Sequence, residues 1–204
     1  EHIKVLDEKA KFLHENELVK LHIKNDLGTD LYVGLPKNHI WQSAGSYAKK
    51  ADRFVANIPT EEVFTMPHKD ETSGIVYNAK PLNYSGVLID NFWLKFEDGK
   101  VVDFGAERGY DVLKNLLETD EGSRRIGEMA LVPYDSPISN TKILFLETLF
   151  DENAACHIAL GKAYPTCVQG GPEMTLEGGF VGTTLHGDPH PHTALPGVHQ
   201  HVLS

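Results

Sequence analysis

The stretch NFWLKFEDGKVVDF, residues 91–104, predicts a β-hairpin and, with it, a sheet-rich fold. Aromatic and aliphatic residues dominate both arms, residues 91–96 and 101–104, as is typical of strands that bury one face. Between the arms, residues 97–100 read EDGK, and an Asp-Gly pair is a preferred centre for a tight two-residue turn. We therefore expect the two arms to pair as antiparallel strands.

The rest of the chain predicts further strands and only a few helices. Residues 17–25 alternate apolar and polar side chains and residues 30–35 return after a turn at 26–29, which indicates a second hairpin. No run of repeated strand–helix–strand units is found. We therefore expect an α+β fold, a mostly antiparallel mixed sheet with a few packed helices. Helices are expected at 3–15 and 110–119, a short helix or helical turn at 151–161, and further strands at 54–58, 62–65, 74–79, 86–90, 126–132 and 143–148.

Composition narrows the class of protein. A chain of 204 residues with 41% hydrophobic residues can bury a sizeable core. The net charge of -10 argues against nucleic acid or an anionic membrane as a partner. The sequence has no apolar run long enough to cross a bilayer, no N-terminal signal segment and only two cysteines, so we expect a cytoplasmic protein. Because the chain opens on Glu1 rather than Met, we also expect a fragment or a processed form.

Two glutamates lie next to apolar residues in predicted strands. Glu62 precedes Val63 and Phe64, and alternation turns it inward if Glu61 faces solvent. A carboxylate turned inward is costly unless it is paired or bound to a metal. Glu128 opens an apolar run in the same way. The alternatives are a strand-edge Glu62 paired with a lysine, and a buried salt bridge from Glu128 to one of the arginines at 124 and 125.

An imidazole and a phenol complete the set of candidate side chains. His157 lies in an apolar segment, and Tyr164 follows two helical turns later, so both could share one face of a helix. A buried core histidine and an ordinary tyrosine at the core edge are the alternatives. Carboxylate, imidazole and phenol groups together suit zinc, cobalt or manganese better than a soft thiolate site would. A carboxylate-bridged metal pair that activates water can hydrolyse an amide.

The segments around these residues resemble the aminopeptidase T family of metallo-aminopeptidases. The segments are GTDL at 28–31, NIPTEEVFTMPHKD at 57–70, RIGEMALV at 125–132 and NAACHIALGKAY at 153–164, in the family's order. The likeness runs from about residue 20 to about residue 177 and covers the family's catalytic domain only. It implies two divalent metal ions, zinc or cobalt with manganese as a further candidate, and removal of N-terminal residues from peptides. It also implies a homodimer.

The resemblance implies a role for each candidate residue. The family's first ligand falls on Glu62, its metal-bridging ligand on Glu128, its ligand histidine on His157 and its site tyrosine on Tyr164. The family then closes its site with a His-x-Asp pair, which would fall on His186 and Asp188.

The last stretch, residues 178–204, differs from the rest in composition. It contains no Lys or Arg and holds five of the eleven His residues. Segments rich in His, Pro and Gly rarely build a packed core. We therefore expect a metallo-aminopeptidase-like catalytic domain at 1–177 and an atypical tail at 178–204 that could be disordered. The sequence PHPH at 189–192 replaces the family's apolar stretch, so ligands at His186 and Asp188 and a structureless tail are alternatives.

The function expected from these observations is hydrolysis of peptides that have a free N-terminus, through a metal-activated water. Glu128 and Tyr164 would be the catalytic residues, with Tyr164 stabilising the oxyanion. The substrate's α-amino group would coordinate one metal or meet an acidic residue such as Glu61. The alternatives are a truncated, metal-binding domain without turnover, a metal-dependent hydrolase of esters, and metal binding by the His-rich tail alone.

Overall fold

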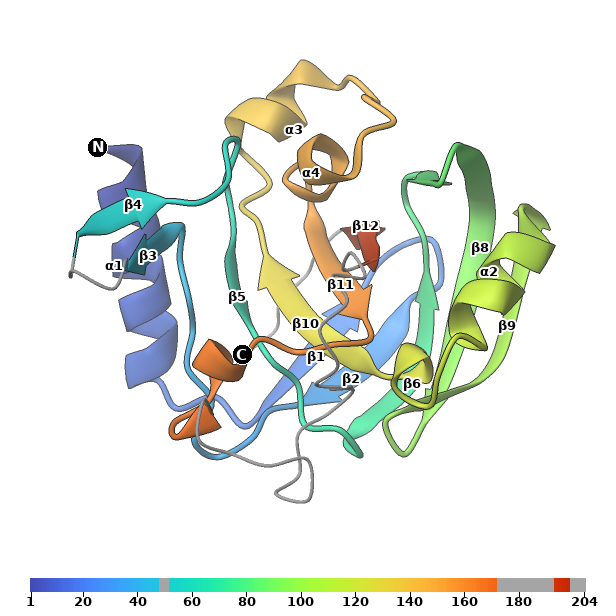
Figure 1. Ribbon diagram of the computed structural model, residues 1–204, viewed down its shortest axis with the longest axis horizontal. Helices are drawn as coiled ribbons and strands as arrows, with labels where there is room; N and C mark the ends of the chain where they lie inside the picture. Colours follow the sequence, from blue (N-terminus) through green and yellow to red (C-terminus); the bar gives the residue numbers. More distant parts are fainter. Residues whose placement is uncertain (48–51, 172–192, 199–204) are drawn as a thin grey trace.

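The computed structural model describes residues 1–47, 52–171 and 193–198 and confirms an α+β fold of mostly antiparallel sheet (Figure 1). The larger sheet has the order β1-β2-β6-β8-β7, with β9 paired to β8. Its strands are β1 (Lys20–Lys24), β2 (Asp30–Gly34), β6 (Thr72–Tyr77), β7 (Leu82–Tyr84), β8 (Val87–Glu97) and β9 (Lys100–Arg108).

A second sheet has the order β12-β11-β10-β5. Its strands are β5 (Val63–Thr65), β10 (Ile126–Leu131), β11 (Cys156–Leu160) and β12 (Thr193–Val198). A separate pair joins β3 (Gly45–Tyr47) to β4 (Arg53–Val55). The two larger sheets share one hydrophobic core, which contains residues from both, such as Leu94, Phe96, Met129 and Ile158.

The hairpin predicted at 91–104 is confirmed. Glu97 pairs with Lys100 at the end of β8 and β9, and Asp98 and Gly99 between them both have positive φ, at 47° and 75°. Two consecutive residues with positive φ match the twist of antiparallel strands, and glycine adopts this conformation without steric cost. The side chains of Phe92, Leu94 and Phe96 alternate into the core, which fixes the register of β8.

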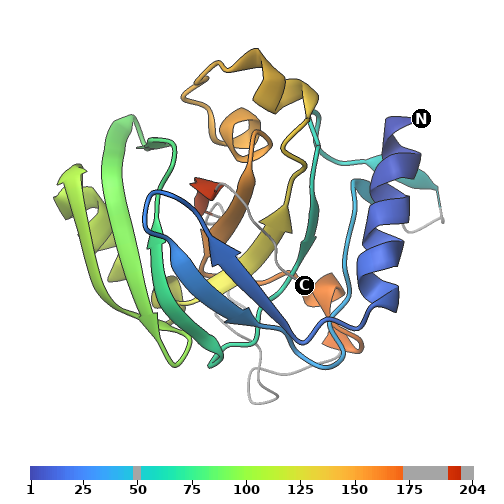
Figure 2. The same cartoon turned by 180° about the vertical axis from the view of Figure 1, so that it is seen from behind.

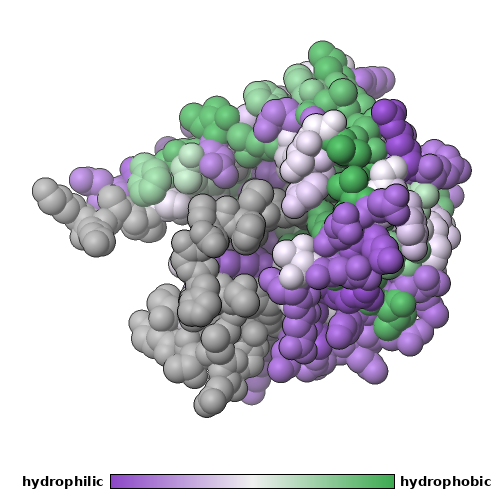
Figure 3. Space-filling model, turned by 45° about the vertical axis from the view of Figure 1, so that its right-hand side comes forward, coloured by the Kyte–Doolittle hydropathy of each residue, from purple (hydrophilic) through white to green (hydrophobic). Residues whose placement is uncertain are grey.

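Helices pack against strands of both larger sheets. α1 (His2–Glu15) buries Leu6 and Ala10 and contacts β5, on the side away from the larger sheet in both ribbon views (Figures 1 and 2). The other helices are α2 (Tyr110–Leu117), α3 (Pro137–Thr141) and α4 (Thr148–Glu152), with 3-10 turns at Gly122–Arg124 and Pro165–Cys167. Among the helices described here, none has the length and apolar character that crossing a membrane requires. On the face shown in Figure 3, hydrophilic side chains gather at the lower right and hydrophobic side chains in the upper part.

Two predicted elements are wrong. Residues 156–160, expected to be helical, form β11, and all five of its residues are buried. A strand buried on both faces shows no alternation, so its apolar run looks the same as a buried helix. Residues 143–148, expected to be a strand, pair with no strand in the described part of the chain, and Thr148 begins α4. The backbone N–H groups of Phe145 and Glu147 instead donate to the Asp151 carboxylate, at 2.9 and 3.2 Å.

Candidate metal centre

Strand register places the three candidate ligands on one face of the second sheet. Ala130 of β10 pairs with Phe64 on one side and with His157 on the other. Glu62 lies two residues before Phe64, and Glu128 lies two residues before Ala130. Side chains two residues apart in an extended chain point to the same face. The pairing of β10 with β11 is irregular between Ile126 and Glu128, and such irregularities commonly redirect a side chain.

Gly127 is the residue within that irregularity. A Cβ atom at this position would collide with the carbonyl oxygens of Gly161 and Lys162. Glycine therefore allows the chain after β11 to pass close to β10 just before Glu128.

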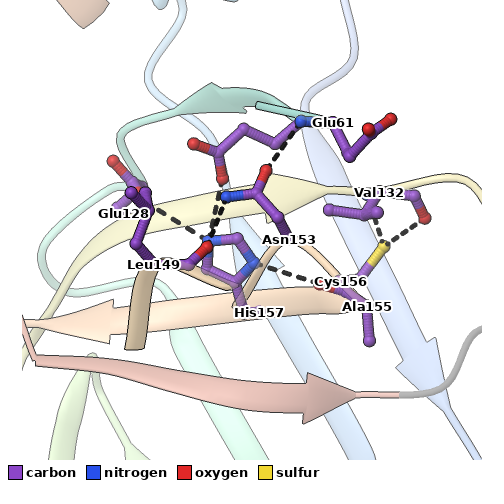
Figure 4. A network of polar contacts seen from close by, with 9 residues as sticks. Glu61, Glu128, Val132, Leu149, Asn153, Ala155, Cys156 and His157 are labelled. Carbon is purple, nitrogen blue, oxygen red and sulfur yellow. Dashed lines mark hydrogen bonds and ion pairs between the residues drawn. The ribbon is translucent and has the colours of Figure 1, made fainter. Parts of the chain in front are cut away.

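His157 is held so that one ring nitrogen faces the glutamates. Its side chain is fully buried, and Nδ1 lies 3.0 Å from the carbonyl oxygen of Ala155 (Figure 4). A carbonyl oxygen can only accept, so Nδ1 carries the hydrogen of this bond. In the neutral ring Nε2 then presents a lone pair, the form in which histidine binds a metal.

The glutamate oxygens converge on that nitrogen. His157 Nε2 lies 2.9 Å from Glu62 Oε2 and 3.8 Å from Glu128 Oε1. One ligand atom from each of the three residues lies within 4.8 Å of the other two. Beyond this 2.9 Å ion-pair contact, the buried atoms His157 Nε2 and Glu62 Oε2 have no hydrogen-bond partner among the described residues. Buried polar atoms normally have partners, and a divalent cation would satisfy both, so the residues fit a metal.

The electrostatics of the group also favour a cation. Burial and the charge of Glu62 raise the pKa of Glu128 to about 8. Burial by itself would lower the pKa of His157, but the carboxylates of Glu62, Glu152 and Glu128 outweigh it and raise that pKa to about 10. Without a metal, Glu128 and His157 therefore retain their protons, because each proton offsets the negative charge of the neighbouring carboxylates.

The candidate metal ligands lie at a cavity of about 440 Å³. Glu62, Glu128 and Tyr164 lie on its wall, and the ring of Tyr164 packs against Phe64 with 5.8 Å between ring centroids. Burial and the charge of Glu128 raise the pKa of Tyr164, so its phenol keeps its proton. The tyrosine thus presents a hydrogen-bond donor group beside the candidate metal ligands.

Comparison with known proteins shows the family of the chain. The family model described as thermophilic metalloprotease (M29) matches residues 1–188. The chain belongs to the M29 family. The sequence is 52% identical over 176 residues to aminopeptidase AmpS of Bacillus subtilis (strain 168) and 50% identical over 171 residues to aminopeptidase T of Thermus aquaticus.

The match covers most of this chain but less than half of the M29 relatives. The two alignments span 86% and 84% of this chain, and 43% and 42% of the relatives. A solved structure, wild-type AmpT from Thermus thermophilus, has a TM-score of 0.85 and 42% identity, covering 95% of this chain and 47% of that chain.

The two arginines that the sequence offered as salt-bridge partners of Glu128 pair with other acidic residues in this M29 chain. Arg124 lies 3.7 Å from Glu118, and Arg125 lies 3.0 Å from Asp70. Glu128 is therefore left for the group formed with Glu62 and His157.

Glu61 does not lie where it was expected. It is only 8% exposed rather than solvent-facing, and its carboxylate lies 3.4 Å from His2 of α1, outside the residues that line the cavity. Its backbone N–H donates to Asn153 Oδ1 at 2.6 Å, a contact that holds the segment before β5 against the end of α4 (Figure 4). The expectation that Glu61 meets the substrate's α-amino group is therefore wrong for this arrangement.

Glu152 was missed by the analysis of the sequence. It lines the cavity with Glu62 and Glu128. Burial and the negative charges of Glu62 and Glu147 raise its pKa to about 7, against the opposing effect of His157. The signal in the sequence was an acidic residue two positions before the mostly apolar run 154–160, a pattern close to the one that singled out Glu128.

His186 and Asp188 lie outside the described residues. Within the predicted tail, the backbone of Thr193–Val198 forms β12 and pairs antiparallel with β11, with Ala194 opposite Ala159. The ligand roles of these two residues and the nature of the tail as a whole stay predictions.

Proposed function

We propose that this chain is the catalytic part of an M29 metallo-aminopeptidase that hydrolyses the first peptide bond of peptides with a free N-terminus. The observation that carries the proposal is the convergence of Glu62, Glu128 and His157 on one point beside a cavity. Relatives about 50% identical over most of this chain are named as aminopeptidases.

The chain's own residues have separate tasks in this proposal. Glu62, Glu128 and His157 Nε2 would hold the divalent metal. When bound there, the metal would polarise the scissile carbonyl and make a water molecule nucleophilic by lowering its pKa. Tyr164, with its proton retained, would donate a hydrogen bond to the oxygen that gains negative charge during the reaction.

The finer details of the proposal come from the resemblance to the family. They are two metal ions, zinc or cobalt, bridged by Glu128, with His186 and Asp188 as further ligands. A homodimer and a cytoplasmic location belong to the same proposal, as does a division into a catalytic domain at 1–177 and a tail at 178–204.

The test measures metal content and the turnover of aminoacyl-p-nitroanilides, for the chain and for Glu128→Gln. Glu118→Gln is the matched control, because Glu118 lies at the surface and pairs with Arg124. We expect two metals per chain, and turnover that Glu128→Gln reduces by at least about 100-fold while Glu118→Gln leaves it unchanged. If metal remains in Glu128→Gln and the parent chain shows no more turnover than this variant, the result would favour metal binding by the tail and an inactive domain.

A further inference from the structure

The loop that carries Tyr164 follows β11 and leads into the 3-10 turn Pro165–Cys167. Tyr164 is 41% exposed, so burial in the core does not by itself hold the phenol in one place. Its ring contacts the ring of Phe64 on β5, and both side chains line the cavity. The position of the phenol relative to the metal ligands therefore depends on how this loop is tied to β5.

A segment of the chain, residues 38–42, connects the loop to β5. The backbone of Gln42 exchanges two hydrogen bonds with the backbone of Phe64, with N···O distances of 2.8 and 3.0 Å. Toward the loop, the backbone N–H of Ile40 donates to the carbonyl oxygen of Cys167 at 2.7 Å. The segment is thus bonded both to β5 and to the turn that follows Tyr164.

The side chain of Gln42 adds a further bond at the cavity. Its Nε2 donates to the carbonyl oxygen of Thr166 at 2.7 Å, and Gln42, Tyr164 and Thr166 all line the cavity. A carbonyl oxygen can only accept, so this bond requires the amide donor of the glutamine. Gln42 therefore holds β5 with its backbone and, with its side chain, holds the loop two residues beyond Tyr164.

The strand that Gln42 holds begins directly after Glu62, one of the candidate metal ligands. From this geometry we infer that Gln42 is a positioning residue for the reaction, which holds the phenol of Tyr164 beside the metal ligands. The inference rests on the proposed function and adds a residue that acts through Tyr164 rather than on the substrate. A displacement of about 1 Å in a group that acts on the transition state is enough to slow a reaction.

The test is a double-mutant cycle on the turnover of leucine p-nitroanilide by the zinc-loaded chain. We expect Gln42→Ala to lower kcat about 3- to 10-fold with little change in KM, the size of effect that one hydrogen bond supports. In the Tyr164→Phe background the same substitution should change kcat little, because the hydroxyl group through which Gln42 acts is already absent. An equal loss of kcat in both backgrounds would overturn the inference.

Gln42→Met separates the hydrogen bond from packing, because methionine keeps the length of the side chain and has no N–H donor. We expect it to lower kcat as Gln42→Ala does, and a kcat equal to that of the parent chain would overturn the inference. Thermal melting of each zinc-loaded variant shows that it is folded.

Asn38→Ala is the matched control. The side chain of Asn38 donates to the carbonyl oxygen of Gln169 at 3.3 Å, between the same two parts of the chain but outside the lining of the cavity. We expect this substitution to change kcat by less than about 2-fold. A loss of kcat equal to that of Gln42→Ala would mean that any tie between the two parts has the same effect, which would overturn the specific role of Gln42.

NMR separates this inference from the proposed function because it needs no turnover. Nuclear Overhauser effects between the rings of Phe64 and Tyr164, whose centroids lie 5.8 Å apart, report the position of the loop. We expect these effects to weaken in Gln42→Ala and to persist in Asn38→Ala. Weakening in a chain without turnover would support the positioning of Tyr164 by Gln42 and contradict the function. Turnover in Gln42→Ala with unchanged kcat and unchanged ring contacts would support the function and overturn the inference.

Discussion

His157 Nε2 lies 2.9 Å from Glu62 Oε2, although β10 separates β11 from the segment before β5. The two side chains approach each other across β10, over the face of the sheet on which Glu128 lies. Their proximity determines how the metal-free site holds its protons and how it would hold a cation, and four predictions follow from the surrounding geometry.

Removing the charge of Glu62 should lower the pKa of His157 from its value of about 10. Burial favours the neutral ring, and Glu62 is the nearest carboxylate that opposes this effect. Titration of the metal-free Glu62→Gln variant, followed by the NMR signals of the histidine ring, measures the change. Glu71→Gln, beside the half-buried His68, is the control and should shift the pKa of His157 little. An unchanged pKa of His157 in Glu62→Gln would show that the pair is not coupled.

Replacing Tyr164 by phenylalanine should remove a catalytic hydrogen bond and leave the fold intact. The ring contact with Phe64 does not need the hydroxyl group, so the melting temperature should change little. We expect kcat to fall about 100-fold or more with little change in KM, because the donor acts on charge that develops in the transition state. A rise in KM with kcat preserved would instead assign the hydroxyl to substrate binding.

Asn153→Ala should destabilise the chain by about 2–3 kcal/mol. The side chain is fully buried, and its loss leaves the Glu61 N–H and the Leu149 carbonyl oxygen without this partner. Urea denaturation measures the free energy of unfolding. Asn115→Ala, at an exposed position of α2, is the matched control and should stay within about 0.5 kcal/mol of the parent chain. Equal effects at the two positions would contradict a structural role for Asn153.

The metal-free chain should lose stability as the pH rises. Folding raises the pKa of Glu128 from 4.5 to about 8, that of Glu152 from 4.5 to about 7 and that of His157 from 6.5 to about 10. Between each pair of values the folded state binds more protons than the unfolded state, so the free energy of unfolding falls with pH. The slope is at most about 1.4 kcal/mol per pH unit for each proton of difference.

Urea denaturation with a chelator, between about pH 5 and pH 9, checks this prediction. Glu128→Gln should flatten the dependence, because it removes one of the three groups. Metal should reverse the trend, since ligands must lose their protons to bind it. A metal-free chain whose stability rises with pH over this range would contradict the assigned proton uptake.

Local chemistry explains what could be predicted from the sequence. The turn between β8 and β9 depends on Asp98 and Gly99, whose conformational preferences act over a few residues. Glu62, Glu128 and His157 were singled out by the same kind of local contrast, a titratable group beside apolar neighbours. The class of the fold, α+β with mostly antiparallel sheet, follows from the number and spacing of such local signals.

Long-range pairing explains what could not be predicted. β11 was mistaken for a helix because both of its faces are buried, a property that its neighbours impose. Glu61 was expected at the substrate and lies against α1 instead, whereas Glu152, overlooked in the sequence, faces the cavity.

The sequence by itself therefore determined which side chains could bind a metal and where the chain turns, since both depend on residue type and near neighbours. Only the tertiary structure decided which of those side chains meet. Strand register sets that outcome, because a shift of one residue between β10 and either neighbour would turn Glu62 or His157 to the opposite face of the sheet.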